Sequence, residues 1–306
     1  MLFLAIGLAL YVAAFAVSER LVYRAGRDNP FFKIATASQR EFDWIILGAS
    51  HAMPFDFAGV TAAIEADTGQ RILNLAGPGT GPLYNRFVLE QFLQTHRTAS
   101  VLYVADSFAF QSRSWNEDRF LDSKLLGRTP LDASQARRLL RYVVAEGVDV
   151  RALLDYVTGF SKLNDRDRLK PDIWEGAAQF DRVNRPSAVA DAKRIAYLYP
   201  DARGREAAMA RYLDVFAALI DVARQRGIRV TVIKLPVPPQ FYAKLPDEAA
   251  FDAGLANLLA NKGVQFADFS SVMGEPRFYF DSDHLNRQGV EVFVKTYLNP
   301  ILAGQR

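Results

Sequence analysis

The chain has 306 residues, of which 50% are hydrophobic, 12% are aromatic and none is cysteine. This composition supports a large apolar core and excludes intrinsic disorder, disulfide bonds and cysteine-based catalysis or metal binding. The 37 basic and 34 acidic residues nearly cancel and leave a formal net charge of +3. Because the sequence also lacks a nucleic-acid-binding motif, we do not expect a nucleic-acid partner.

A hydrophobic stretch opens the chain. Residues 2–17 contain no charged side chain, and a helix continued to Tyr23 is long enough to cross the roughly 30 Å hydrocarbon core of a bilayer. We therefore predict a transmembrane anchor over residues 1–23. A cleaved signal peptide is the alternative, because the segment AFA at residues 14–16 resembles a cleavage site.

Basic residues follow this stretch, and none precedes it. The positive-inside rule, applied to these residues alone, places the bulk of the protein in the cytoplasm. Residues 24–41, which are broken at Asn29-Pro30, are predicted to connect the anchor to the rest of the chain. The basic residues closest to the stretch are Arg20, Arg24 and Arg27.

From residue 42 to the C-terminus the sequence alternates between apolar strands and amphipathic helices. Five strands are predicted, and each is apolar enough to be buried on both faces, which favours a parallel α/β sheet. The alternation stops at about residues 111–205, where charged helical segments occur without a clear strand. We predict a helical insertion there, serving as a lid or a docking surface. The predicted strands cover residues 44–47, 71–75, 101–105, 228–235 and 264–269.

A serine follows the first predicted strand in the sequence Gly48-Ala49-Ser50-His51. The residue just past the carboxyl end of a parallel strand lies at the mouth of the ligand crevice, and backbone N–H groups of the following turn lie close to it. Ser50 is therefore a candidate nucleophile. Taken alone, the same pattern also fits a serine that caps the next helix.

A serine nucleophile needs a base, most often histidine, and a carboxylate that orients the base. The sequence contains three histidines. His51 adjoins the serine, and adjacent side chains usually diverge. His96 ends a helix, where a cation interacts favourably with the helix dipole. His284 therefore remains as the candidate base.

Asp281 and His284 are three residues apart just before the final helix, so one helical turn places both side chains on the same side. The Asp281 carboxylate can then accept a hydrogen bond from Nδ1 of His284 and leave Nε2 facing Ser50. Asp283, which is immediately adjacent to His284, is not expected to orient it. We predict Ser50, His284 and Asp281 as the catalytic residues, and no metal site.

Acyl chemistry also needs N–H donors that stabilise an oxyanion near the serine. Ser50 supplies its own N–H if the turn is sharp. Asn74 and the glycine-rich loop at residues 77–81 follow the second strand and can supply further donors. The loop matches neither glycine motif for nucleotide phosphates, so we do not expect a nucleotide there.

The order of these blocks resembles the SGNH/GDSL hydrolase superfamily over residues 42–298. Three blocks carry the resemblance: GASHA at residues 48–52, the loop containing glycine and asparagine after the second strand, and FDSDHLNRQGVEVF at residues 280–293. The third block is the most specific of the three.

The resemblance implies a three-layer, flavodoxin-like parallel sheet and a reaction without a cofactor. It implies Ser50 as nucleophile, His284 as base, Asp281 as the orienting carboxylate and Gly77 as an oxyanion donor.

The sequence departs from the family after the third strand. The family has G-x-N-D there, whereas residues 104–108 read VADSF, so the usual asparagine donor is missing. Ser107 or Asn74 takes its place, or nothing does.

The missing asparagine, the N-terminal hydrophobic segment and KLPVPPQFY at residues 234–242 are similar to the membrane-anchored DltD-like subgroup. Those proteins work with a membrane-bound O-acyltransferase to attach acyl or D-alanyl esters to envelope polymers outside the cytoplasm. The resemblance implies such a partner, an envelope polysaccharide or acyl ester as substrate, and a periplasmic or extracellular catalytic domain. This orientation contradicts the one predicted from the arginines, and we give the family-wide match more weight.

The sequence therefore predicts a single-pass membrane protein that performs serine-based acyl-ester chemistry, as an esterase or an O-acyltransferase. Two alternatives remain open. One is a catalytically weak accessory subunit of a membrane-bound O-acyltransferase. The other is a secreted carbohydrate or lipid esterase released from its signal peptide.

Overall fold

The computed structural model describes residues 2–25, 29–166, 174–201 and 203–304. These residues form two compact units. The first contains the described residues of Met1–Ser38 and Glu117–Ile173, and the second contains those of Gln39–Asn116 and Trp174–Arg306. The predicted insertion is therefore divided between the units, because only its described residues after Asn116 and before Trp174 pack with the N-terminal helices.

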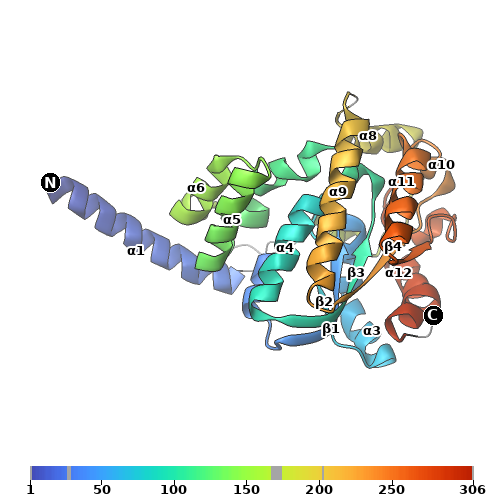
Figure 1. The fold of residues 1–306 in the computed structure, drawn as a ribbon, viewed down its shortest axis with the longest axis horizontal. Coiled ribbons are helices and arrows are strands. Elements are labelled where there is room, and N and C mark those ends of the chain that lie inside the picture. The colour runs from blue at the N-terminus through green and yellow to red at the C-terminus, as the bar shows by residue number, and fades with distance from the viewer. Residues whose placement is uncertain (1, 26–28, 167–173, 202, 305–306) are drawn as a thin grey trace. The chain divides into compact units, whose positions relative to one another are not determined.

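A five-stranded parallel sheet forms the centre of the second unit (Figure 1). The strands lie in the order β2-β1-β3-β4-β5, and every pairing is parallel. This confirms the predicted parallel α/β sheet, and the order is that of flavodoxin-like doubly wound sheets. The strands are β1 (Glu41–Gly48), β2 (Ile72–Asn74), β3 (Arg97–Val104), β4 (Arg229–Lys234) and β5 (Gln265–Asp268).

Both β1 and β3 begin earlier than their hydrophobic runs predicted. Their first residues pair with each other, Glu41 with Arg97 and Phe42 with Thr98. Glu41 and Arg97 are exposed and interrupt the apolar pattern, whereas Phe42 and Thr98 are buried at this end of the pair.

Helices cover both faces of the sheet, because successive side chains of a strand point to opposite sides. On one face, Trp44 belongs to an apolar core that also contains Ile64 and Phe293. On the other face, Tyr103 packs on Phe216, with ring centroids 4.4 Å apart. The longer helices of this unit are α3 (Val60–Thr68), α4 (Pro82–Thr95), α8 (Ala188–Leu198), α9 (Arg205–Arg224), α11 (Glu248–Asn261) and α12 (Arg287–Phe293).

Short helical segments connect these elements. They are η1 (Ser50–Asp56), η2 (Ser107–Phe110), η3 (Arg113–Trp115), η6 (Glu175–Gln179), α10 (Pro239–Tyr242), η7 (Pro276–Phe278), η8 (Val294–Leu298) and α13 (Asn299–Leu302).

The direction in which the chain builds the sheet reverses between β1 and β3, which are neighbours in the centre. In open parallel sheets, ligands bind outside the carboxyl ends of the strands at such a switch point. Ser50 follows β1 and Asp106 follows β3. The fold therefore brings the end of the first strand and the end of the third strand to the position where a site is expected.

The first unit contains the N-terminal hydrophobic helix, α1 (Leu2–Ala25). Its stretch Leu2–Tyr23 is long and apolar enough to cross a membrane, with a mean hydropathy of 2.0. Only 6% of the apolar window is buried, so α1 is not a core helix of this unit. The structure thus confirms a helix of membrane-spanning length, a property that signal sequences share.

The second helix of this unit, α2 (Pro30–Thr36), begins where the sequence shows a break. Oδ1 of Asn29 accepts hydrogen bonds from the N–H groups of Phe31 and Phe32, and Pro30 occupies the first turn, where its missing N–H has no cost. Residues 26–28 of the predicted connector lie outside the described residues. The remaining elements are η4 (Glu117–Leu121), η5 (Ser123–Gly127), α5 (Ala133–Ala145), α6 (Val150–Thr158) and α7 (Phe160–Leu163).

Candidate active site

A sharp turn at the end of β1 places Ser50. Gly48 has a φ of +144°, and a Cβ at this position would lie 2.8 Å from the carbonyl oxygen of Val104, so only glycine fits. Its N–H donates to Oδ1 of Asn85 at 3.2 Å, and its carbonyl accepts from Oγ1 of Thr80 at 2.9 Å. The strand therefore ends abruptly, and Ser50 begins η1 at the carboxyl edge of the sheet.

The structure brings the three predicted catalytic residues together. Nε2 of His284 lies 2.9 Å from Oγ of Ser50. Nδ1 of His284 lies 3.0 and 2.9 Å from the two carboxylate oxygens of Asp281. With the proton on Nδ1, the imidazole donates to the carboxylate and Nε2 accepts from the serine hydroxyl. Ser50 and His284 are both buried, whereas the Asp281 side chain is 37% exposed.

The segment before α12 holds the histidine ring in place. The N–H groups of Asp283 and His284 both donate to Oδ1 of Asp281, at 3.1 and 2.8 Å, so a tight bend brings Asp281 toward the ring. The ring also stacks on Phe280, with centroids 5.3 Å apart, and contacts Trp174. Asp281 and His284 thus meet through this bend and not through the helical turn that the spacing predicted.

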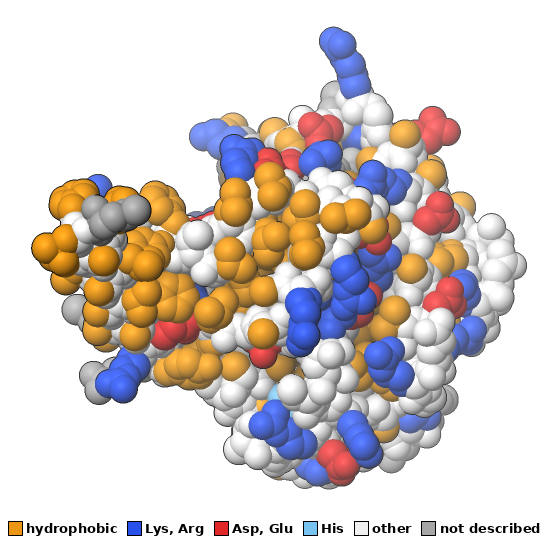
Figure 2. All heavy atoms as spheres, turned by 60° about the vertical axis from the view of Figure 1, so that its left-hand side comes forward, with side chains coloured by type: hydrophobic (Ala, Val, Ile, Leu, Met, Phe, Trp, Pro, Cys, Tyr) orange, Lys and Arg blue, Asp and Glu red, His pale blue; other side chains and the backbone are white. Residues whose placement is uncertain are grey.

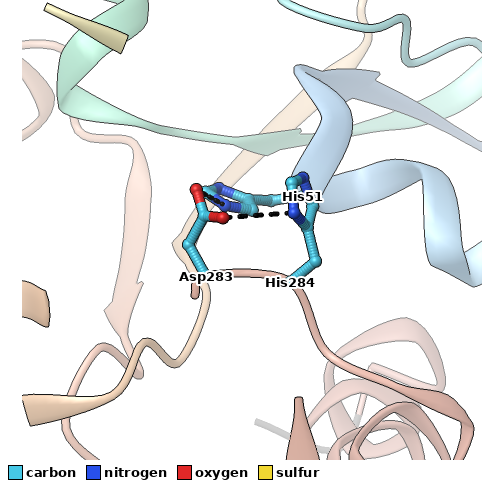
Figure 3. Close-up of side chains that lie close together, drawn as sticks. All are labelled: His51, Asp283 and His284. Atoms are coloured by element: carbon cyan, nitrogen blue, oxygen red, sulfur yellow. Dashed lines mark ion pairs between the residues drawn. The ribbon is translucent and has the colours of Figure 1, made fainter. Parts of the chain in front are cut away.

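Asp283 also reaches His284, against the expectation from the sequence. One of its carboxylate oxygens lies 3.2 Å from Nδ1 of His284, and the other lies 3.1 Å from Nε2 of His51 (Figure 3). The Asp283 side chain is completely buried. The expectation was wrong because the bend at residues 281–283 turns adjacent side chains inward, whereas in a strand or helix they diverge.

The second histidine of the site, His51, lies between two carboxylates. Its Nδ1 is 2.6 Å from Oδ1 of Asp106, and its ring centroid is 4.6 Å from that of His284. Burial alone would lower the pKa of His51, but Asp106 and Asp283 outweigh it and raise the pKa to about 10. His51 therefore carries a proton at neutral pH, which leaves it unsuited to act as a general base.

Arg194 of α8 completes this chain of charges. Its Nε donates to both oxygens of Asp283, at 3.0 and 2.9 Å, and its Nη2 lies 3.5 Å from Nε2 of His284. Burial alone would raise the pKa of Asp283, but Arg194 and His284 outweigh it and hold the pKa well below its usual range. Asp283 is therefore ionised, and the cations Arg194 and His51 compensate its buried charge.

Three side chains in this cluster could present ligand atoms to a metal ion. One ligand atom from each of His51, Asp283 and His284 lies within 4.8 Å of the others. However, Arg194 already binds both oxygens of Asp283, Nε2 of His284 faces Ser50, and Nδ1 of His51 faces Asp106. These contacts favour an ion-pair network over a metal centre.

Two of the predicted oxyanion donors lie near the serine turn and are engaged in it. The N–H of Gly77 donates to the carbonyl of Gly48 at 3.3 Å. Nδ2 of Asn74 donates to the carbonyl of Ala52 at 2.8 Å, and Oδ1 of Asn74 accepts from the N–H of Ala76. These hydrogen bonds stabilise the turn, so either residue would have to exchange a partner to contact an oxyanion.

The other two predicted donors differ from each other. The Ser107 hydroxyl is buried and hydrogen-bonds with Tyr199, at 2.6 Å, and with Glu248. Ser50, by contrast, is the first residue of η1, where a backbone N–H has no acceptor within the helix. Among the four predicted donors, the Ser50 N–H is thus the one whose position leaves it available.

A small cavity lies beside the Asp106 end of the site. It has a volume of about 30 Å³, which is enough for about one water molecule, and polar side chains line much of it. Nζ of Lys234 donates to Glu248 at 2.7 Å in its wall. An acyl chain or a sugar ring does not fit there. The polar lining residues are His51, Asp106, Ser107, Tyr199, Lys234, Tyr242, Glu248 and Ser270.

The sequence did not identify three members of this cluster, Asp106, Asp283 and Arg194. Asp106 follows β3 just as Ser50 follows β1, so its place at a strand end was a usable signal. The repeated aspartate in DSDH at residues 281–284 was a second signal. Arg194 carries no local signal, because it lies in the predicted insertion, far from the other residues in the sequence.

No protein-family model and no curated protein matches this chain. A crystal structure from Bacteroides fragilis NCTC 9343, provisionally described as an acylhydrolase, is similar over 91% of this chain and 98% of its own. The TM-score is 0.41 and the sequence identity is 11%. At this level of similarity, function has to be argued from the site itself.

Proposed function

We propose that this chain is a membrane-anchored serine acyl-esterase or O-acyltransferase that works through an acyl-serine intermediate. The observation that carries the proposal is the hydrogen-bonded series from Ser50 through His284 to Asp281 at the switch point of the sheet. A nucleophile, a base and an orienting carboxylate in this order are the elements that acyl transfer requires.

In the first half of the reaction, Nε2 of His284 takes the hydroxyl proton of Ser50 while Oγ attacks the acyl carbonyl. The tetrahedral oxyanion is stabilised by the N–H of Ser50. When the carbon–oxygen bond to the leaving group breaks, the protonated His284 gives its proton to that oxygen. The products are the acyl-serine and an alcohol.

In the second half, a hydroxyl group takes the place of the departed alcohol. His284 removes its proton, the hydroxyl oxygen attacks the acyl-serine carbonyl, and Oγ of Ser50 recovers the proton as the bond to it breaks. A polysaccharide hydroxyl yields a new ester, and water yields a free acid. Exclusion of water from the site decides between the two outcomes.

The charged groups around His284 favour both halves of the proposed reaction. Asp281 and Asp283 face Nδ1 and stabilise the imidazolium that forms when Nε2 accepts a proton. Nη2 of Arg194 lies 3.5 Å from Nε2 of His284, on the same ring nitrogen that faces Ser50.

Within this proposal the chain is a member of the SGNH hydrolase superfamily and most similar to its DltD-like subgroup. The catalytic unit then faces the periplasm or the cell exterior, a membrane-bound O-acyltransferase supplies acyl groups, and an envelope polysaccharide is the acceptor. The motif order and the N-terminal hydrophobic helix support this assignment.

Contacts of α1 favour a retained anchor over a cleaved signal peptide. The hydroxyl of Tyr11 donates to the carbonyl of Thr158 at 2.7 Å, and Nζ of Lys162 donates to Glu19 at 2.6 Å. Cleavage after Ala16 would remove the contact of Tyr11 with Thr158. The contact of Glu19 with Lys162 would remain on the shortened helix.

An active-site serine probe tests the catalytic proposal. Full-length protein in membranes should react with a fluorophosphonate, and Ser50→Ala should abolish the labelling. Ser271→Ala, which changes an exposed serine outside the site, should label like the wild type. Labelling that persists in Ser50→Ala would refute the nucleophile assignment. Normal polymer acylation in cells that carry this variant would favour the accessory-subunit alternative.

A further inference from the structure

The first unit carries apolar side chains on its outside. Val150, Leu154 and Val157 lie on one side of α6 at helical spacing and are 50, 53 and 41% exposed. Phe160, at the start of α7, is 63% exposed. The opposite side of α6 packs inward through the fully buried Tyr156. An apolar stripe of this kind would normally be covered, so something outside this unit is expected to cover it.

The same region packs against α1. The hydroxyl of Tyr11 reaches Thr158, and the ring of Phe15 lies so close to Gly159 that a Cβ there would be 2.3 Å from it. These two contacts tie the end of α6 to the middle of α1.

One turn further along α1, Nζ of Lys162 pairs with Glu19, and the N–H of Leu131 donates to the same carboxylate oxygen. The Lys162 side chain is completely buried. The end of α6, α7 and the second half of α1 therefore form one packed element.

These contacts lie within the candidate membrane span of α1. At about 1.5 Å per residue, Tyr11 lies about 12 Å from Glu19, toward the middle of the candidate span. If Leu2–Tyr23 crosses the membrane, the chain that packs on Tyr11 and Phe15 must enter the hydrocarbon region or its boundary. Leu154, Val157 and Phe160 belong to that chain.

The charges of α5 fit the same arrangement. Arg137 and Arg141 are exposed on the side of α5 that also exposes Leu140 and Val144. Figure 2 shows a face of the molecule on which hydrophobic side chains lie next to Lys and Arg side chains. Helices that lie in a membrane interface combine apolar residues with basic residues whose head groups reach the lipid phosphates.

We propose that α5, α6 and α7 form a membrane-embedded collar, joined to α1 through α7 and the end of α6, and that the apolar stripe of α6 contacts lipid. The inference rests on the anchor included in the proposed function and extends it, since the membrane-bound part becomes a helical unit and not a single helix. The occupant of the stripe is the bilayer because the end of α6 packs on Tyr11 and Phe15 within the candidate span and because the exposed arginines of α5 complement anionic head groups.

Site-directed spin labelling tests this, and the natural chain simplifies it because it has no cysteine. Full-length variants Leu154→Cys and Val157→Cys are labelled with a nitroxide and reconstituted in vesicles of phosphatidylcholine and phosphatidylglycerol. Leu8→Cys in α1 reports the anchor, and Gln225→Cys after α9 reports a water-exposed site. The measurement is the ratio of nitroxide accessibility to oxygen, which enters lipid, and to a nickel chelate, which does not.

The ratio at positions 154 and 157 should match position 8 and exceed position 225 by about tenfold, because a polar chelate is excluded from hydrocarbon. Lipid-like values at position 8 with water-like values at 154 and 157 would overturn the collar and leave the anchor intact. Water-like values at all of these positions would overturn both. The two α6 variants are independent reporters of one surface.

Lipid-like values that occur only in native membranes, and not in vesicles of the purified protein, would also overturn the proposal and assign the stripe to a protein partner. Fluorophosphonate labelling of Ser50 on the same samples is read separately. Its failure would count against the catalytic function and not against the collar.

Discussion

Two sides of the site are each built around a buried histidine, and they use it in opposite ways. On one side, His284 faces the Ser50 hydroxyl at Nε2 and carboxylates at Nδ1. On the other, His51 faces a carboxylate at each ring nitrogen, Asp106 at 2.6 Å and Asp283 at 3.1 Å. The first ring exchanges a proton with Ser50 in the proposed reaction, and the second holds a proton at neutral pH.

The difference shows that partners, and not burial, decide what a histidine does here. Both rings are buried and lie side by side. His51 is fixed as a cation because two carboxylates outweigh the cost of burying its charge. His284 stays available because the partner of its Nε2 is a neutral hydroxyl. Asp283 joins the two sides, since each of its oxygens contacts a different ring.

The largest expected effect follows from removing the reactive side. Ser50→Ala or His284→Gln should lower kcat/KM for an activated ester by about 10⁴- to 10⁶-fold, because nucleophile and base act as a unit. His96→Gln, which changes a histidine remote from the site, should leave it unchanged. A loss in His51→Gln as large as in His284→Gln would show that both histidines take part in the proton transfer, and the contrast between the two sides would fail.

The two aspartates allow a sharper comparison. Asp281→Asn should lower kcat by about 10⁴-fold, as for other orienting carboxylates, with little change in the free energy of unfolding because its side chain is partly exposed. Asp283→Asn leaves the buried His51 and the partly buried Arg194 without their shared anion, which should destabilise the fold by about 3–5 kcal/mol. Steady-state kinetics and denaturant unfolding on both variants separate these effects.

The opposite outcome would also identify the orienting carboxylate. If Asp283→Asn lost activity at unchanged stability while Asp281→Asn stayed active, Asp283 would be the orienting carboxylate. The bend that holds His284 makes both arrangements sterically possible.

The sequence was sufficient to predict the parallel α/β sheet, and its three candidate catalytic residues, Ser50, His284 and Asp281, lie together in the structure. Buried parallel strands are continuous apolar runs, and a strand-end serine with a DxxH segment is a local pattern. The remainder of the cluster depends on tertiary contacts. Arg194 meets Asp283 only because α8 folds back over the carboxyl edge of the sheet, and no spacing in the sequence encodes that contact.

The sequence also could not predict that the insertion is divided between the two compact units. Its amphipathic helices looked alike, yet α5 and α6 pack in the unit of α1, whereas α8 packs in the unit of the sheet. Hydrophobic periodicity shows that a helix has an apolar side and does not show which partner covers it.

The raised pKa of His51 predicts that the stability of the fold depends on pH. Folding raises the pKa of His51 from 6.5 to about 10, so its ion pairs stabilise the folded state fully below pH 6.5 and are lost as the pH rises through 10. Between these values the folded state binds one proton more than the unfolded state, and the free energy of unfolding should fall by about 1.4 kcal/mol per pH unit. His51→Gln should remove this slope.

Denaturant unfolding of the full chain in detergent at several pH values provides the measurement. Other titrating groups contribute equally to the wild type and the variant, so the difference between their slopes isolates His51. Parallel curves between pH 7 and pH 9 would mean that His51 is not held as a cation in the folded state.

The smallest expected effect concerns the oxyanion donor that the sequence could not assign. Removing a donor typically lowers kcat by about 10²- to 10³-fold, whereas we expect Ser107→Ala to lower it by less than about threefold. The reason is that the Ser107 hydroxyl is committed to Tyr199 and Glu248 and not to the space beside Ser50. Single-turnover acylation of the full chain measures the step directly. A loss of 10²-fold or more at unchanged substrate affinity would mean that Ser107 turns to the oxyanion, so the Asp106 side would take part in catalysis and the two sides would share one function.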